Sequence, residues 1–178
     1  MTKENLAAHF NDNHQQVLDF INALPDHAFI QRANEKWTPG EQLEHICLCI
    51  KPIAQALGSK EFIEEKFGHI QRATFSSDEI MDQYKTALAN GGKAPQKFIP
   101  AAVDLSRKTA LISETQTTLK DIGQHLDHYS EHEMDSLVLP HPLLGALTLR
   151  EMFFLMSFHA LHHLEQTRIN LLTNDTIS

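Results

Sequence analysis

The stretch TLREMFFLMSFHALHHLEQTRINLL, residues 148–172, constrains the fold more than any other part of the chain. It runs for about seven helical turns without glycine or proline, which predicts one long helix. Thr148 and Glu151 have the spacing of a capping box, in which each side chain bonds the backbone N–H of the other. His159 and His163 lie four residues apart and therefore leave one face of this helix. Because neutral imidazole is the commonest metal ligand among side chains, the pair indicates a metal site.

Length and charge limit the classes of protein to which the chain belongs. Its 178 residues fit a single domain spanning 1–178. The net charge is −8, and no basic stripe is interleaved with aromatic residues, so we expect no nucleic-acid partner. We find no secretory signal and no apolar run long enough to cross a bilayer, so we expect no membrane partner and a cytoplasmic location. Cys47 and Cys49 lie two residues apart on a helix and point in different directions, so we expect them not to pair, and reduced thiols suit that location.

Three more long helices are predicted from hydrophobic periodicity, over residues 3–24, 39–57 and 104–133. The second has its own capping box, Thr38 with Glu41, and Pro52 should bend it. Residues 58–104 are irregular, with one short helix over 60–67 and another that Ser76 or Ser77 caps and Gly91-Gly92 ends. Residues 93–100 are expected to be extended or looped. We expect a turn-rich link before the fourth helix and no sheet, so the chain predicts an all-α four-helix bundle.

The strongest candidate metal site combines His45 with His159 and His163. Two ligands on one helix and a third from a neighbouring helix leave at least one coordination position open, as in catalytic zinc sites. Ala160 stands where zinc metalloproteases have a glutamate, which argues against that class. The alternative is that these histidines are packing or surface residues.

Several other residues have two readings each. His14 is either a hydrogen-bonded core histidine or a residue lining the site, and Cys49 is either a small buried thiol or a fourth ligand. His162 points away from the pair and suits an interface, while Gln166 returns to the inner face. A second stripe on the third helix is either a metal site or a solvated flank or dimer surface; it consists of Asp121, His125, His128 and His132.

Four segments resemble the DinB-like superfamily, also called damage-inducible or YfiT-like, of four-helix-bundle metalloproteins. They are WTPGEQLEH at 37–45, KAPQKFIP at 93–100, HPLLGALTLREM at 141–152 and HALHHLEQ at 159–166. The resemblance implies an up-down-down-up bundle with a long connection between its second and third helices, and frequent homodimers. Carried over position by position, it implies His45, His159 and His163 as the metal ligands.

The resemblance also implies a function. Members include transferases and isomerases that use low-molecular-weight thiols, and metal-dependent hydrolases, with nickel, zinc or iron as the divalent metal. We therefore expect a metal-dependent enzyme, a thiol-dependent S-transferase or a hydrolase acting on a small-molecule substrate, with His14 or Glu41 as a general base. The alternative is a non-catalytic metal- or ligand-binding stress-response bundle. An open coordination position would favour the enzyme, and a site closed by Cys49 or His14 would favour the alternative.

Overall fold

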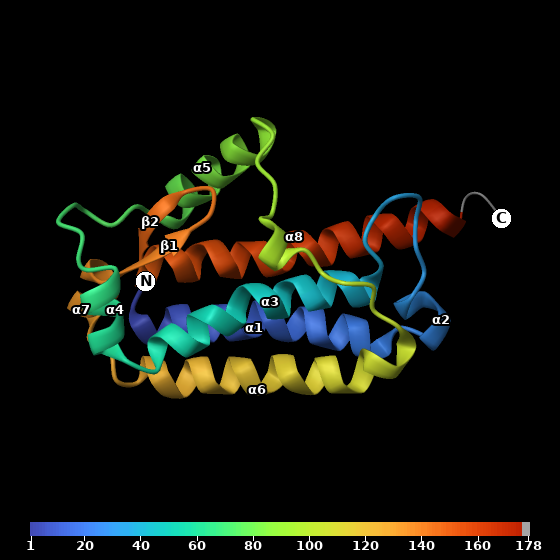
Figure 1. The fold of residues 1–178 in the computed structure, drawn as a ribbon, viewed down its shortest axis with the longest axis horizontal. Helices are drawn as coiled ribbons and strands as arrows, with labels where there is room; N and C mark the ends of the chain where they lie inside the picture. Colours follow the sequence, from blue (N-terminus) through green and yellow to red (C-terminus); the bar gives the residue numbers. More distant parts are fainter. Residues whose placement is uncertain (176–178) are drawn as a thin grey trace.

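The computed structural model describes the backbone of residues 1–175 and the side chains of residues 1–172. Four long helices lie side by side and form the body of the protein (Figure 1). They are α1 (Lys3–Ala23), α3 (Pro39–Leu57), α6 (Lys108–Leu126) and α8 (Leu149–Asp175). The shorter elements are α2 (Asp26–Phe29), α4 (Lys60–Lys66), α5 (Ser77–Ala89), the 3₁₀ turns η1 (Gln96–Phe98) and η2 (Leu105–Arg107), α7 (Glu131–Ser136) and the strands β1 (Val138–His141) and β2 (Gly145–Thr148). The all-α prediction is confirmed.

The direction of the long helices explains the long connection. In Figure 1, α1 and α8 run one way along the bundle, and α3 and α6 run the other way, which is the predicted up-down-down-up order. Because α3 and α6 are parallel, the chain must travel back along the whole bundle between them. Residues 58–104 make that return, and on the way they place α5 and η1 against α8 and α3.

The core is formed by the apolar stripes of the four long helices. Phe10 of α1 and Phe153 of α8 meet with ring centroids 4.8 Å apart, and Ile46 and Ile50 of α3 and Ile122 of α6 are fully buried. Each such side chain contributes roughly 1.5–3 kcal/mol by leaving water. The apolar periodicity that predicted the four helices is therefore also what holds them together.

The capping box at the start of α8 is present and has a second task. Glu151 Oε2 accepts the Thr148 N–H at 2.8 Å, and Thr148 Oγ1 accepts the Glu151 N–H at 3.2 Å. The fully buried Glu151 carboxylate also accepts from Arg72 at 2.5 and 2.8 Å and from the Phe75 N–H at 2.7 Å. The Glu151 carboxylate thus caps the N-terminus of α8 and also binds the long connection to this helix.

The prediction of a single helix over 104–133 was wrong. Helix α6 ends at Leu126, and α7 begins after Ser130, whose side chain and the Glu133 carboxylate form another capping box. Tyr129 is buried in the intervening turn and donates its hydroxyl to the Leu57 carbonyl at 2.9 Å. The break separates His125, His128 and His132, so they do not form one helical stripe. The Ser-x-x-Glu signal for a new helix start was in the sequence.

The link before α8 was also predicted incompletely, because it contains a hairpin. Strands β1 and β2 pair antiparallel, with Val138 opposite Thr148 and Pro140 opposite Ala146. Proline is tolerated here because both strands of a two-stranded ribbon are edges. Gly145 has φ +73°, a conformation that favours glycine at the turn.

The elements of the long connection agree with the sequence. Helix α4 covers the first short segment, Ser76 caps α5, and Gly91 takes φ +87° beyond its end. Residues 93–100 are extended apart from the single turn η1. Helix α3 continues through Pro52. None of the helices in the described part of the chain has the length and apolar character needed to span a bilayer.

The anchoring role of Glu151 predicts an acid-sensitive contribution to stability. Burial alone would raise the pKa of Glu151, but hydrogen bonds from Arg72, Phe75 and Thr148 outweigh it and hold the pKa below 4.5. A carboxyl with a lowered folded pKa stabilises the fold above its unfolded pKa, and this contribution is lost as pH falls through the folded value. We expect Glu151→Gln to lower the free energy of unfolding by about 3 kcal/mol at neutral pH, measured by urea denaturation.

The control is Glu79→Gln, which alters the exposed capping box of α5 and should change stability much less. The difference in the free energy of unfolding between wild type and Glu151→Gln should decrease as pH falls below 4.5. A gap that is constant with pH would show that the Glu151 charge does not act as described.

Candidate metal centre

Helices α3 and α8 bring His45, His159 and His163 together in the interior of the bundle. The three side chains are 4%, 5% and 9% exposed. His159 Nε2 lies 3.2 Å from His45 Nε2 and 3.0 Å from His163 Nε2. Two nitrogen ligands held about 2.0–2.1 Å from one metal ion lie about 2.9–3.4 Å apart at the usual coordination angles. Each of these two distances therefore fits a pair of ligands on one metal ion.

Hydrogen bonds at the opposite ring nitrogens orient two of these imidazoles. His45 Nδ1 lies 2.6 Å from the Phe98 carbonyl oxygen, and His163 Nδ1 lies 2.6 Å from Gln42 Oε1. Both oxygens only accept, so each Nδ1 holds the proton and donates it, which leaves each Nε2 with a free lone pair. This arrangement of a histidine fixed through its outer N–H is usual for metal ligands.

Burial keeps the three imidazoles neutral. It lowers the pKa of His45 below 6.5, against an opposing effect of the Phe98 carbonyl, and it lowers the pKa values of His159 and His163 well below 6.5. The neighbouring histidines lower these pKa values further, because a second positive charge nearby is unfavourable. Neutral imidazole is the form that binds metals.

Cys49 places a sulfur atom, a possible additional metal ligand, beside the three histidines. Its Sγ lies 3.7 Å from His45 Nε2, and the candidate ligand atoms of His45, Cys49 and His159 all lie within 4.8 Å of one another. Burial raises the pKa of the Cys49 thiol to about 12. Both cysteines are free thiols, as expected.

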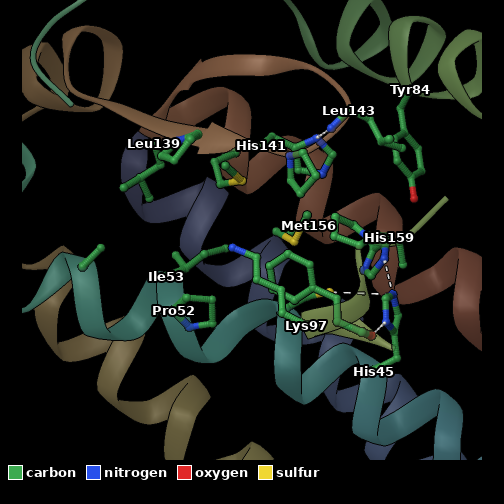
Figure 2. Close-up of a pocket in the computed structure, with 18 of the residues that line it drawn as sticks. His45, Pro52, Ile53, Tyr84, Lys97, Leu139, His141, Leu143, Met156 and His159 are labelled. Carbon is green, nitrogen blue, oxygen red and sulfur yellow. Dashed lines mark hydrogen bonds between the residues drawn. The ribbon is translucent and has the colours of Figure 1, made fainter. Parts of the chain in front are cut away.

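The cluster opens into a cavity of about 450 Å³ (Figure 2). His45 and His159 line one end of it, and Tyr84 of α5 and His141 of the hairpin lie across the cavity from α3 (Figure 2). Lys97, from the long connection, also lines it. Four separate parts of the chain therefore enclose the space in front of the histidines.

A second, smaller hollow reaches the cluster from the other side. It measures about 250 Å³ and is lined by His163, its partner Gln42, and His162. Trp37, the single tryptophan, also lines it and packs against His45 with ring centroids 4.9 Å apart. His162 and Gln166 thus face this hollow and not the larger cavity.

A profile of the DinB superfamily matches residues 9–167, nearly the whole chain. The chain belongs to the DinB superfamily. No curated protein matches it. Family membership confirms the resemblance seen in the sequence.

The two candidate bases lie outside the histidine cluster of the DinB bundle. The Glu41 carboxylate accepts the Thr38 N–H at 2.9 Å and forms an ion pair with Arg32, so it completes the α3 capping box. His14 donates Nδ1–H to the Phe10 carbonyl at 2.8 Å, and its buried Nε2 has no hydrogen-bonding partner among the described residues. Burial lowers the pKa of His14 to about 4. His14 does not line the cavity.

Sequence reasoning missed the groups that orient and face the histidines of this DinB-superfamily chain. Gln42 lies three residues before His45, and that spacing was a usable signal, since it places both on one helix face. The Phe98 carbonyl comes from the long connection, where no side-chain pattern marks it. Tyr84 and His141 reach the cavity only through the packing of α5 and the hairpin against α8.

Proposed function

We propose that this DinB-superfamily protein is a divalent-metal-dependent enzyme in which His45, His159 and His163 bind the metal. The observation that supports this most strongly is that His159 Nε2 lies 3.2 Å from His45 Nε2 and 3.0 Å from His163 Nε2, beside a cavity that His45 and His159 line. Imidazole ligands suit zinc, nickel and iron alike. A metal bound there would act as a Lewis acid and would lower the pKa of a coordinated water or thiol.

Within this proposal, the chain's own residues have separate tasks. Gln42 and the Phe98 carbonyl hold the rings of His163 and His45 in position. The cavity admits a small molecule to the His45 and His159 side of the site and limits the water around it. Three protein ligands leave a position open toward that cavity, as catalytic sites require.

The reaction class that the cavity favours is transfer involving a thiol. None of the described residues that line the cavity is Asp or Glu, so no carboxylate there would act as a general base toward a metal-bound water. A thiol ionises far more easily than water and depends less on such a base. We therefore propose a thiol-dependent S-transferase in preference to a hydrolase. A homodimer and a cytoplasmic location remain predictions.

Metal content tests the ligand set. We expect wild-type protein, purified without an affinity tag, to bind close to one zinc per chain by elemental mass spectrometry. His159→Ala should lose that metal and keep its helical circular dichroism, while His128→Ala, which changes an exposed histidine, should retain it. Trp37 gives a second readout, because its ring packs against His45 and its fluorescence should respond to Ni²⁺ only when the site is intact.

Cys49→Ala decides whether the site is open. With three histidine ligands, this variant should bind as much zinc as wild type. Loss of metal from Cys49→Ala would mean that a fourth protein ligand closes the site, which would favour the non-catalytic binding bundle. Unchanged metal content in His159→Ala would refute the ligand set.

The bond from Gln42 to His163 predicts a graded effect on affinity. Gln42→Leu removes the acceptor of the Nδ1 proton, and loss of such a partner weakens metal binding by about 10–100-fold. Gln42→Glu keeps an acceptor at the same place and should preserve zinc affinity. Competition with a zinc-binding dye gives both Kd values. Equal weakening by the two substitutions would indicate a packing role for Gln42.

Paired assays test the reaction class. Zinc-loaded enzyme should accelerate the transfer of a thiol to an aromatic electrophile such as chlorodinitrobenzene more than it accelerates hydrolysis of para-nitrophenyl acetate. Both rates should fall to background in His159→Ala and stay unchanged in His128→Ala. Hydrolysis alone would support the hydrolase, and a metal-loaded protein without either activity would support the binding bundle.

A further inference from the structure

The walls of the large cavity are apolar over most of their extent. Phe67 lies at the end of α4, Leu88 comes from α5, Leu143 from the hairpin turn, and Met152 and Met156 from α8. Such a surface gains free energy by covering apolar atoms and loses it by dehydrating polar ones. The body of a molecule that fits here is therefore apolar.

The polar side chains around this space are mostly hydrogen-bond donors. The charged side chains among the described residues that line it are Lys93 and Lys97, both cationic, although the chain as a whole has a net charge of −8. Tyr84 and His141 contribute a hydroxyl and an N–H, and the other polar side chains are Cys49, Gln55 and the metal-site histidines His45 and His159. A group that is negative or accepts hydrogen bonds is thus matched to the cavity.

Tyr84 is the most informative of these residues. Its side chain is 7% exposed, yet no hydrogen bond to its hydroxyl is formed by any residue in the described part of the chain. Figure 2 shows the hydroxyl pointing away from α5, toward His159, and the two rings lie 6.3 Å apart. The hydroxyl faces the cavity, so it is free to donate its proton to a ligand bound there.

His141 presents a second donor. Its Nδ1 accepts the backbone N–H groups of Leu143 and Leu144, both at 3.3 Å. The ring proton is therefore on Nε2, which donates to no residue in the described part of the chain. The hairpin turn thus fixes the tautomer of a histidine that lines the cavity.

We propose that the cavity selects a small monoanion with a compact apolar or aromatic body, whose acidic oxygen or sulfur lies between the histidine cluster and the Tyr84 hydroxyl. The part of this inference that concerns the metal rests on the proposed function. The part that concerns the cavity walls does not. It excludes sugar-based polar thiols as the preferred ligand, since their hydroxyls would lose water against apolar walls without gaining partners.

Three probes separate the features of this ligand class: naphthoate, its neutral amide naphthamide, and thioglucose as a polar thiolate. Isothermal titration into zinc-loaded full-length protein should give binding in the order naphthoate, naphthamide, thioglucose. The loss of one hydrogen bond to an anion in Tyr84→Phe should weaken naphthoate binding about tenfold. The same substitution should leave zinc content unchanged.

A cavity-filling variant with a neighbouring control tests the location. Leu143→Trp places a large ring in the cavity and should weaken naphthoate binding at least about tenfold, because the space for the apolar body is lost. Leu144→Trp changes the next residue, which does not line the cavity, and should bind naphthoate like wild type.

The outcomes for the cavity and for the metal are distinguishable. Zinc bound with no affinity for naphthoate, or thioglucose binding as tightly as naphthoate, would overturn this inference and leave the metal proposal standing. Naphthoate binding that Leu143→Trp abolishes, in a protein that holds no zinc, would support this inference and overturn the proposed function. Equal effects of Leu143→Trp and Leu144→Trp on naphthoate binding would also overturn the inference about the cavity, because the ligand would then lie outside it.

Discussion

The arrangement at the centre of this protein depends on which ring nitrogen of each histidine holds the proton. If the Nε2 atoms of His45 and His163 both carried protons, two donors would face the same point beside His159. The carbonyl of Phe98 and the side-chain oxygen of Gln42 prevent this by binding the opposite nitrogens at 2.6 Å. Two lone pairs then point toward His159 Nε2.

Burial and orientation work together here. An isolated imidazole in the bundle core would be neutral because charge is costly there, but it would not be aimed at anything. The helical spacing of four residues aims His159 and His163 at one side of α8, and α3 supplies the third ring. The cost of burying three polar rings is offset by partners for the outer nitrogens of His45 and His163 and, under the proposal, by a metal for the inner nitrogens of all three.

The long connection between α3 and α6 is what turns a helical bundle into a protein with a cavity. The up-down-down-up order forces this segment to cross the bundle, and it takes part in the site at two points. Its end near η1 provides the Phe98 carbonyl, and α5 provides the Tyr84 wall. Glu151 binds Arg72 and Phe75, which directly precede α5, and so links this segment to the first turn of α8.

The sequence predicted what is determined locally. The stripes of the first, second and fourth long helices and the capping boxes at Thr38 and Thr148 depend on residues three or four apart, and these were predicted correctly. The break after Leu126 had a local signal at Ser130, but the apolar stripe through Tyr129 hid it, since a buried turn residue and a helical core residue look alike in a periodicity pattern. The hairpin was missed because prolines at 140 and 142 favour turns.

What could not be predicted is the set of contacts made across the bundle. The convergence of His45 with His159 joins residues 114 positions apart. The sequence could propose it as one hypothesis, which the resemblance to a family strengthened, but no local spacing determines it. The Phe98 contribution is a backbone carbonyl, which any residue could supply, so no side-chain pattern identifies it. The ring of His45, packed between Trp37 and the cavity, has a polar hollow on one side and apolar walls on the other. The hollow and the cavity therefore present different surfaces to the two sides of the site, and the neutral histidine nitrogens that could bind a metal lie between them.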